Sequence, residues 1–340
     1  MGLLERLIET YGVSGNEKNV RKLIEKEIKS YVDKIFVDKL GNLIAYKKGK
    51  SPKVMLAAHM DEIGLMTKFI DQKGRIFCSL IGGIDPITLV GEIVNIEAKK
   101  GLVRGVITTK NINDGYIVEE LPKEEGLIID TGLTKRELRA KGVEVGNYIS
   151  IEQPIYLLGS NDIICGKAFD DRIGCYILIE LAKRLKNKSK NEIYFVFTIQ
   201  EEIGLFGAIT SAYKIEPDWA IVVDVTAVDD ASIHPTKTIG KGPCITVKDS
   251  DMLGNTCIND WIKKIAHKKK IHYQLDISEF GTTEAVSISI SKGGVPATAI
   301  GVPIRNLHTA TAVASKKDIE NTIKLLEEIM KRAPTECLIE

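Results

Sequence analysis

The sequence predicts an α/β fold that is interrupted by a small all-β module. At both ends of the chain, apolar stretches with the length of buried strands alternate with amphipathic helical stretches. Between about residue 70 and about residue 163, short β-like stretches are separated by glycines and charged turns instead. The chain has 340 residues, which suggests either a large domain that carries an insertion or two domains.

The first 60 residues have the pattern of two helices, a hairpin and a buried strand. Apolar residues at helical spacing predict the first helix, which the glycines at 12 and 15 interrupt. Ser14 and Glu17 have the spacing of a capping box, so a second helix is expected to begin here. Residues 35–46 predict a hairpin, and this hairpin leads into a buried strand that ends at His59.

The middle of the chain has a different character from its two ends. Short strands are predicted at 75–80, 93–98, 103–108 and 148–151, with few helices between them. From residue 166 onward, strands and helices alternate again, with helices at 172–185, 207–213 and 257–269 and a last helix that begins near Ser315. We therefore predict one discontinuous α/β domain, residues 1–69 and 164–340, and an inserted all-β domain, residues 70–163.

The charge balance argues against a nucleic-acid or acidic-membrane partner. The chain has 47 Lys and Arg against 46 Asp and Glu, a net charge of +1. The cluster of lysines at 268–270 is interpreted as a solvated helix end, because no aromatic residues accompany it.

The compartment is predicted from the absence of targeting patterns and from the cysteines. No stretch approaches the roughly 20 apolar residues that a membrane span needs, and the first residues lack the pattern of a signal peptide. The six cysteines are scattered without a Cys-x-x-Cys motif, which predicts free thiols in a reducing compartment. A cytoplasmic protein is expected.

Acidic residues and histidines follow the apolar strands at several places far apart in the sequence. They are His59 and Asp61, the pair Asp170-Asp171, the pair Glu201-Glu202, Asp224, and His308. In open α/β sheets, ligands bind outside the carboxyl ends of the strands, so these residues are expected to converge on one crevice. The set predicts a site for hard or borderline cations.

Each of these motifs, taken alone, also has an explanation without a metal. A histidine after a strand is commonly a hydrogen-bonded core or loop residue. Asp170 and Asp171 can cap a helix and complement its dipole, and Glu201 with Glu202 can occupy a solvated loop. Their common position at strand ends favours the cation site.

The number of donors matches a dinuclear hydrolytic site, which needs a bridging carboxylate, further ligands for each metal and a free carboxylate as base. Asp170 is predicted to bridge the two ions. His59 and Asp224 complete one metal, and Glu202 and His308 complete the other. Glu201 is the predicted base that activates the shared water, and Asp61 accepts the proton of the other His59 ring nitrogen.

Six motifs give the chain a strong resemblance to a known family. They are Gly12 to Glu17, Ala58 to Gly64, Gly166 to Gly174, Gln200 to Gly204, Val222 to Thr226, and the segment from Gly294 to His308. Over essentially its whole length the chain resembles the tetrahedral (TET-type) aminopeptidases, family 42 of metallopeptidase clan MH. This family also includes deblocking aminopeptidases and proteins described as endoglucanases.

The resemblance implies a fold, an activity and an assembly. It implies a phosphorylase/hydrolase-like, mixed-sheet, three-layer catalytic domain with an inserted β-barrel that serves in assembly or dimerisation. It also implies removal of N-terminal residues from peptides by two zinc or cobalt ions, and a hollow homo-oligomer of twelve subunits built from dimers. In similar proteins the peptide bond after the bridging aspartate is cis, so Asp170-Asp171 is expected to be cis.

Three segments depart from the pattern of the family. Relatives commonly carry Gly-Gly-Thr-Asp where this chain has Gly281 to Glu284, and an aromatic residue or Thr where it has Leu307. A Pro- and His-containing stretch of the insert is replaced by residues 108–112. These segments lie where pocket or assembly contacts are expected.

Two other functions were weighed against the aminopeptidase. An endoglucanase-type glycosidase needs two acids about 5 to 9.5 Å apart and no histidine-held metals, so His59 and His308 count against it. A non-catalytic binding or assembly protein on the same scaffold has no need for a base, so the presence of Glu201 counts against it.

Overall fold

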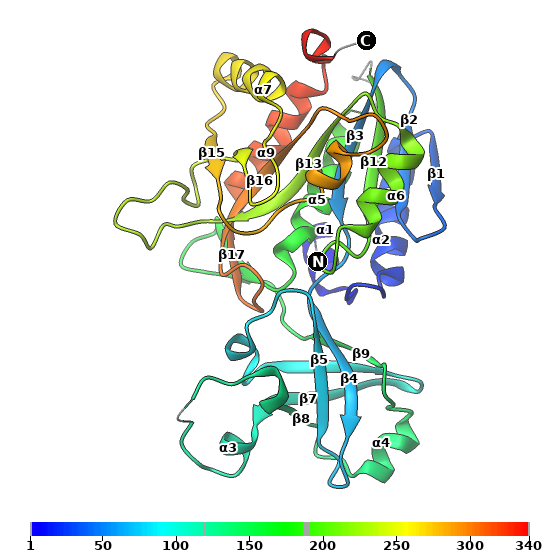
Figure 1. The fold of residues 1–340 in the computed structure, drawn as a ribbon, viewed down its shortest axis with the longest axis vertical. Helices are drawn as coiled ribbons and strands as arrows, with labels where there is room; N and C mark the ends of the chain where they lie inside the picture. The colour runs from blue at the N-terminus through cyan, green and yellow to red at the C-terminus, as the bar shows by residue number, and fades with distance from the viewer. Residues whose placement is uncertain (1, 119, 186–190, 339–340) are drawn as a thin grey trace.

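The computed structural model describes residues 2–118, 120–185 and 191–338. It has a mixed eleven-stranded sheet and a separate closed barrel of six strands (Figure 1), which confirms the predicted fold class. Along its main path the sheet has the order β1-β2-β12-β3-β13-β16-β17-β11-β10. Off this path, β14 pairs with β16, and β15 pairs with β14. The strands are β1 (Lys34–Val37), β2 (Leu43–Lys47), β3 (Lys50–His59), β10 (Tyr156–Leu157), β11 (Ile163–Gly166), β12 (Asn191–Thr198), β13 (Trp219–Ala227), β14 (Cys244–Lys248), β15 (Gln274–Ile277), β16 (Ala297–Arg305) and β17 (Ala312–Ser315).

Four central strands of this sheet run parallel to one another. β12 pairs with β3, β3 with β13, and β13 with β16, all in parallel register. Residues 54–58 of β3 are fully buried, as expected for a strand covered on both faces. The carboxyl ends of all four strands therefore meet at one edge of the sheet.

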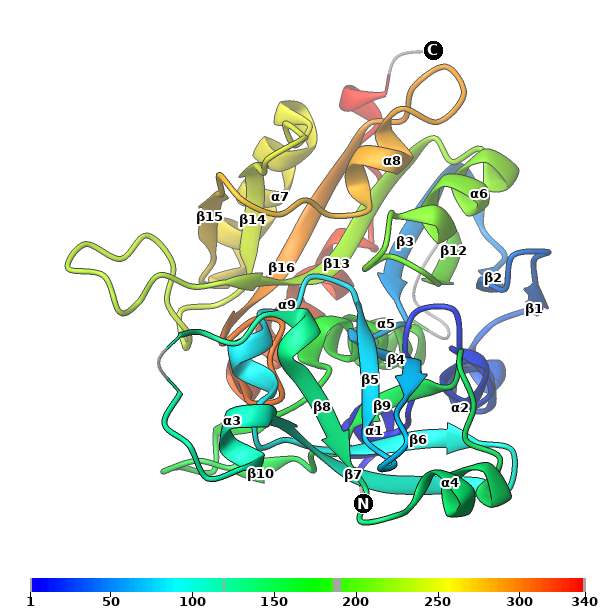
Figure 2. The same ribbon diagram turned by 60° about the horizontal axis from the view of Figure 1, so that its bottom comes forward.

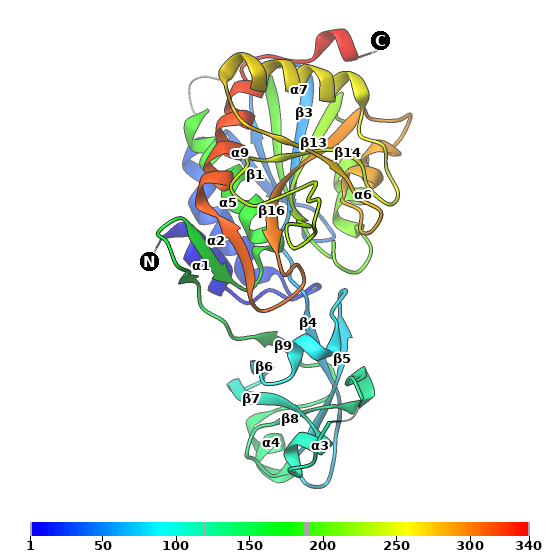
Figure 3. The same cartoon turned by 90° about the vertical axis from the view of Figure 1, so that its left-hand side faces the viewer.

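Helices cover both faces of the sheet, which gives three layers (Figure 3). One core cluster packs the sheet against α1, α2, α5, α7 and α9, and a second packs its other face against α6 and α8. The helices of this domain are α1 (Leu3–Glu9), α2 (Lys18–Ile28), α5 (Phe169–Arg184), α6 (Phe206–Ile215), α7 (Thr256–Lys269), α8 (Ala285–Ser289) and α9 (Lys316–Ile329).

The barrel has the closed strand order β4-β5-β8-β7-β6-β9 and a core of its own (Figure 2). Its elements are β4 (Gly64–Ile70), β5 (Ile76–Ile81), β6 (Ile93–Ala98), β7 (Gly101–Thr109), β8 (Leu127–Asp130), β9 (Tyr148–Ile151), and the helices α3 (Lys110–Asn113) and α4 (Lys135–Lys141). The first strand starts at Gly64, six residues before the boundary drawn from the sequence. β8 and α4 were not predicted. The division of the chain into domains at 69/70 and 163/164 stays a prediction.

Two local predictions were wrong. Ser14 does not cap the second helix, because Glu17 is the N-cap residue of α2 and makes no side-chain cap. The Ser14 hydroxyl instead donates to Asp61 Oδ2 at 2.6 Å. The six cysteines are not all free, because Cys257 and Cys337 form a disulfide across 80 positions with a Cα–Cα distance of 5.6 Å. The other four cysteines are free and buried.

Within the described residues, no helix has the length and apolar character that a membrane span requires.

Candidate metal centre

The structure brings the predicted strand-end residues together at one edge of the sheet. His59 ends β3, Asp224 lies in β13, and Glu201 and Glu202 follow β12. Asp170 lies in the first turn of α5, and His308 lies in the loop between β16 and β17. Because β12, β3, β13 and β16 are parallel neighbours, their ends lie at one edge of the sheet, where Asp170, Glu201, Glu202, Asp224 and His308 line one cavity. His59 contacts one of these residues, Asp170, at 2.8 Å.

Asp170 lies between two sets of donor atoms. Its Oδ1 is 2.8 Å from His59 Nε2, and its Oδ2 is 3.2 Å from His308 Nε2. His59 Nε2 is 4.0 Å from Asp224 Oδ1, and His308 Nε2 is 3.5 Å from Glu202 Oε2. One carboxylate therefore presents one oxygen to each set. The Asp170-Asp171 peptide bond is cis, as the resemblance implied.

Both histidines turn the same nitrogen toward Asp170. His59 Nδ1 is 3.1 Å from the main-chain oxygen of Asp61, and His308 Nδ1 is 2.9 Å from that of Gly83. A carbonyl oxygen can only accept, so each Nδ1 carries a hydrogen. Each Nε2 faces a carboxylate oxygen of Asp170, which also can only accept, so without a cation each Nε2 must carry a hydrogen as well. A metal ion that replaced this second hydrogen would leave a ring protonated at Nδ1 with its Nε2 lone pair free. This is the tautomer that a metal ligand needs. Gly83 follows β5, so the barrel contributes one of these contacts.

Asp61 connects the segment that follows β3 to the loop that follows β12. Its Oδ1 is 3.5 Å from His59 Nδ1, so the nearer acceptor for that proton is its main-chain oxygen. The amides of Glu201 and Glu202 donate to the Asp61 carboxylate at 3.1 and 3.2 Å. Burial alone would raise the pKa of Asp61, but the bonds from His59, Ser14 and Glu201 outweigh it and hold the pKa below its usual value.

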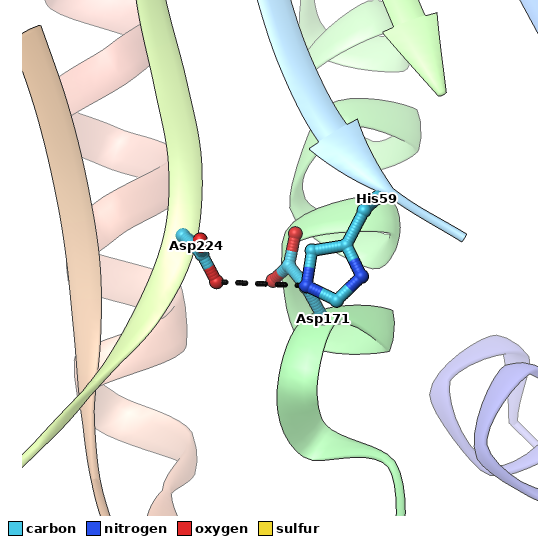
Figure 4. Close-up of side chains that lie close together, drawn as sticks. All are labelled: His59, Asp171 and Asp224. Atoms are coloured by element: carbon cyan, nitrogen blue, oxygen red, sulfur yellow. Dashed lines mark ion pairs between the residues drawn. The ribbon is translucent and has the colours of Figure 1, made fainter. Parts of the chain in front are cut away.

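Asp171 joins the site although it was not among the predicted ligands. Figure 4 shows His59, Asp171 and Asp224 turned toward one another. Donor atoms of these three side chains lie within 4.8 Å of one another, and so do those of His59, Asp170 and Glu202. Asp171 is fully buried, and its Oδ1 accepts from the amide of Gly174. The signal for Asp171 in the sequence was its position directly after Asp170, as the second acid of the pair.

The carboxylates of the site fit a resident cation. Burial raises the pKa of Asp224 to about 7, and the charge of Asp170 adds to this shift. Burial also holds the pKa values of Glu201 and Glu202 well above their usual range. Among the described residues, the buried oxygens Asp171 Oδ2 and Glu202 Oε1 have no hydrogen-bond partner. Crowded, unpartnered carboxylates are costly unless protons or cations balance them, so the donor set suits divalent metal ions.

Glu284 is a further buried acid beside the site that the sequence analysis did not single out for chemistry. It is fully buried, and its Oε2 accepts from the Thr198 hydroxyl at 2.7 Å. Burial raises its pKa to about 8. Thr198 pairs with His59 in the sheet, so Glu284 supports the strand ends that carry the site.

A buried ion cluster lies behind the metal donors. Lys167 pairs with Glu62 Oε2, and Arg172 lies 3.3 Å from Glu62 Oε1. Arg172 also donates to the main-chain oxygens of Met60 and Thr10, both at 2.7 Å. The cluster therefore ties the N-terminal segment to the ends of β3 and to the start of α5.

We expect Lys167→Met to lower the free energy of unfolding by about 3 kcal/mol, because it leaves the buried Glu62 carboxylate with one cation partner, Arg172, in place of two. The matched control is Arg184→Met, which removes a partly exposed pair with Glu320 and should cost under about 1 kcal/mol. Urea denaturation of the two variants measures the difference. If both variants lose the same free energy of unfolding, the buried Lys167–Glu62 pair stabilises the fold no more than the partly exposed Arg184–Glu320 pair does.

The chain is similar over nearly its full length to peptidases that act at the N-terminus of peptides. The fold and these similarities define it as a hydrolase of peptide bonds, an aminopeptidase. The sequence model of the M42 glutamyl aminopeptidase family matches residues 41–325, and the chain belongs to this family. The resemblance found in the motifs is thereby confirmed.

Individual relatives agree with this assignment. The lysyl aminopeptidase of Pyrococcus furiosus is 34% identical over 346 residues, covering 97% of this chain and 96% of the relative. The structure of an aminopeptidase from the archaeon Desulfurococcus kamchatkensis has a TM-score of 0.94 at 35% identity, covering 98% of this chain and 95% of the other. The TET1 peptidase of Pyrococcus horikoshii, described as assembling into a tetrahedron or a large octahedral shell, has a TM-score of 0.87 at 29% identity, covering 97% and 99%.

Proposed function

We propose that this aminopeptidase works with two divalent metal ions, zinc or cobalt, and that Glu201 is its general base. The position of Asp170 carries the proposal, since its two oxygens face His59 Nε2 and His308 Nε2 at 2.8 and 3.2 Å. In this assignment Asp170 bridges, His59 and Asp224 hold one ion, and Glu202 and His308 hold the other. The bound ions supply an acidic water and polarise the carbonyl of the first peptide bond.

The roles of the other residues follow from their contacts. Glu201 lines the cavity beside these donors, and its carboxylate is assigned no ligand role, so it is free to take a proton from the attacking water and pass it to the departing amine. Asp61 orients His59 and the loop of Glu201 through the hydrogen bonds described above. Asp171, facing His59 and Asp224, shares the first ion site or orients its ligands.

Chelation tests this proposal. Removal of metal should abolish hydrolysis of aminoacyl arylamides, and added Zn²⁺ or Co²⁺ should restore it. The control substrate is a β-glucan, the substrate class of the endoglucanase alternative. Chelator-resistant cleavage of the arylamide, or chelator-resistant cleavage of the glucan, would contradict the metal-dependent aminopeptidase.

We also propose that the chain forms a homo-oligomer through its barrel, a tetrahedral dodecamer built from dimers, in the cytoplasm. The shell-forming TET1 relative supports the assembly. Large apolar side chains are exposed on α3 and on the segment that follows it, including Ile112, Tyr116, Ile117 and Leu121, with exposed fractions of 46 to 84%. Such a patch is typical of a surface that another protein covers. No nucleic-acid or membrane partner is expected from the balanced charge.

A further inference from the structure

A cavity of about 520 Å³ adjoins the metal donors and extends away from them. Asp170, Glu201, Glu202, Asp224 and His308 line one side of it. The scissile carbonyl must lie against these residues if the proposed function is right. The side chain of the first residue branches from the atom next to that carbonyl, so it must enter the remainder of the cavity.

That remainder combines apolar and acidic walls. Leu205, Val225 and Leu307 are among its apolar residues, and the small Ala299 and Gly301 of β16 leave room for a long side chain. Its charged residues outside the metal donors and Glu201 are Asp249 and Asp276, and among the described residues that line it there is neither Lys nor Arg.

The charge of Asp276 is already balanced. Lys237, itself buried, lies behind the cavity wall with its Nζ 2.5 Å from Asp276 Oδ1. The same ammonium donates to the hydroxyls of Thr226 and Ser278 at 3.1 and 2.9 Å. Asp276 and Lys237 therefore form a neutral, hydrogen-bonded pair.

The charge of Asp249 is not balanced in this way. Its partners are neutral donors: the amides of Asp251, Met252 and Thr283 and the hydroxyl of Thr282. Across the part of the chain that the structure describes, no Lys, Arg or His forms an ion pair with it. Of these bonds, only that from the Thr283 amide reaches Oδ2, at 3.3 Å, and a carboxylate oxygen has room for a second donor.

We propose that the cavity selects peptides with a basic first residue, Lys or Arg, and that Asp249 is the specificity-determining residue. The aliphatic stem lies along the apolar wall, and the cationic end lies near Asp249. A first residue with a carboxylate finds no Lys or Arg among the described residues that line the cavity and is repelled by Asp249, so an N-terminal Glu is rejected. This inference rests on the proposed aminopeptidase function.

Norleucine separates charge from shape, because it has the stem of Lys without the ammonium. With the metal-loaded, full-length protein, we expect kcat/KM for Lys-arylamide to exceed that for norleucine-arylamide by about 10-fold or more, and that for Glu-arylamide by about 100-fold or more. Asp249→Asn should lower the Lys-to-norleucine ratio by about 10-fold.

The control is Asp251→Asn, which removes an exposed charge two positions away that does not line the cavity. It should leave the Lys-to-norleucine ratio unchanged. A Lys-to-norleucine ratio of kcat/KM near one in the unaltered protein would overturn the proposal, and this measurement needs no variant. The same ratio in Asp249→Asn as in the unaltered protein would also overturn it. If norleucine-arylamide is hydrolysed and Lys-arylamide is not preferred, the specificity proposal is wrong but the proposed aminopeptidase function is not contradicted. If no arylamide is hydrolysed, both proposals are wrong.

Discussion

Glu201→Gln is expected to lower kcat by on the order of 10³-fold or more while both metal ions stay bound. The substitution keeps the size of the side chain and removes its ability to take a proton. Because Glu201 is assigned no ligand role, metal content and KM should change little. Single-turnover kinetics together with metal analysis of the purified variant measure the effect.

The control for this variant is Glu279→Gln, which neutralises an exposed glutamate whose side chain is 73% accessible and which does not line the cavity. It should keep the kcat of the unaltered protein. If Glu201→Gln keeps its kcat, another group is the base. If Glu201→Gln loses a metal ion, Glu201 is a ligand and its assignment must be exchanged with another acid of the site.

Asp170→Asn is expected to weaken the binding of both metal ions together. A side chain that only orients a ligand typically changes metal affinity by about 10- to 100-fold, so loss of a shared ligand should cost more than about 100-fold. Asparagine keeps the shape of the residue but offers one neutral oxygen in place of two charged ones. Equilibrium dialysis against a competing chelator measures both affinities.

The matched comparison is His308→Gln, which removes a donor from one set only. That variant should lose one ion and keep the other, because His59 and Asp224 lie on the opposite side of Asp170. If Asp170→Asn and His308→Gln behave alike, the bridging assignment is wrong.

The order of the main elements could be predicted because the strong signals are local. The apolar run before His59 and the run before Asp224 are long enough to indicate buried strands without knowledge of their neighbours. The expected helix at 257–269 corresponds to α7 (Thr256–Lys269), and the expected cap at Ser315 is present at the start of α9. Position near the end of a buried strand was then enough to single out the histidines and acids of the candidate site. Asp224 was expected to follow its strand but lies inside β13, which continues to Ala227.

Features that depend on distant contacts could not be predicted. Ser14 has the spacing of a helix cap. Its hydroxyl instead donates to the carboxylate of Asp61, which is 47 positions away in the sequence. The Cys257–Cys337 disulfide has no spacing signal, because only packing of the C-terminal segment against α7 brings the sulfurs together. The sequence around Glu284 has no pattern that indicates burial. The fold buries this side chain against Thr198, whose hydroxyl donates to it.

The strands of the insert were predicted less completely than those of the α/β domain, because some of them have weak local signals. β4 continues the chain directly from the site, so its start at Gly64 has no turn signal that separates it from the preceding segment. β8 has the sequence Leu-Ile-Ile-Asp, a short apolar run without the alternation of apolar and polar residues that marks a half-buried strand.

The central claim is that two ions share Asp170. Counting the metal ions that restore activity tests it most directly. Metal-free protein is titrated with Zn²⁺ or Co²⁺ while arylamide hydrolysis and bound metal per chain are both measured. We expect full activity to require two ions per chain and Asp170→Asn to bind neither ion tightly. Full activity with one ion, or with none, would contradict it.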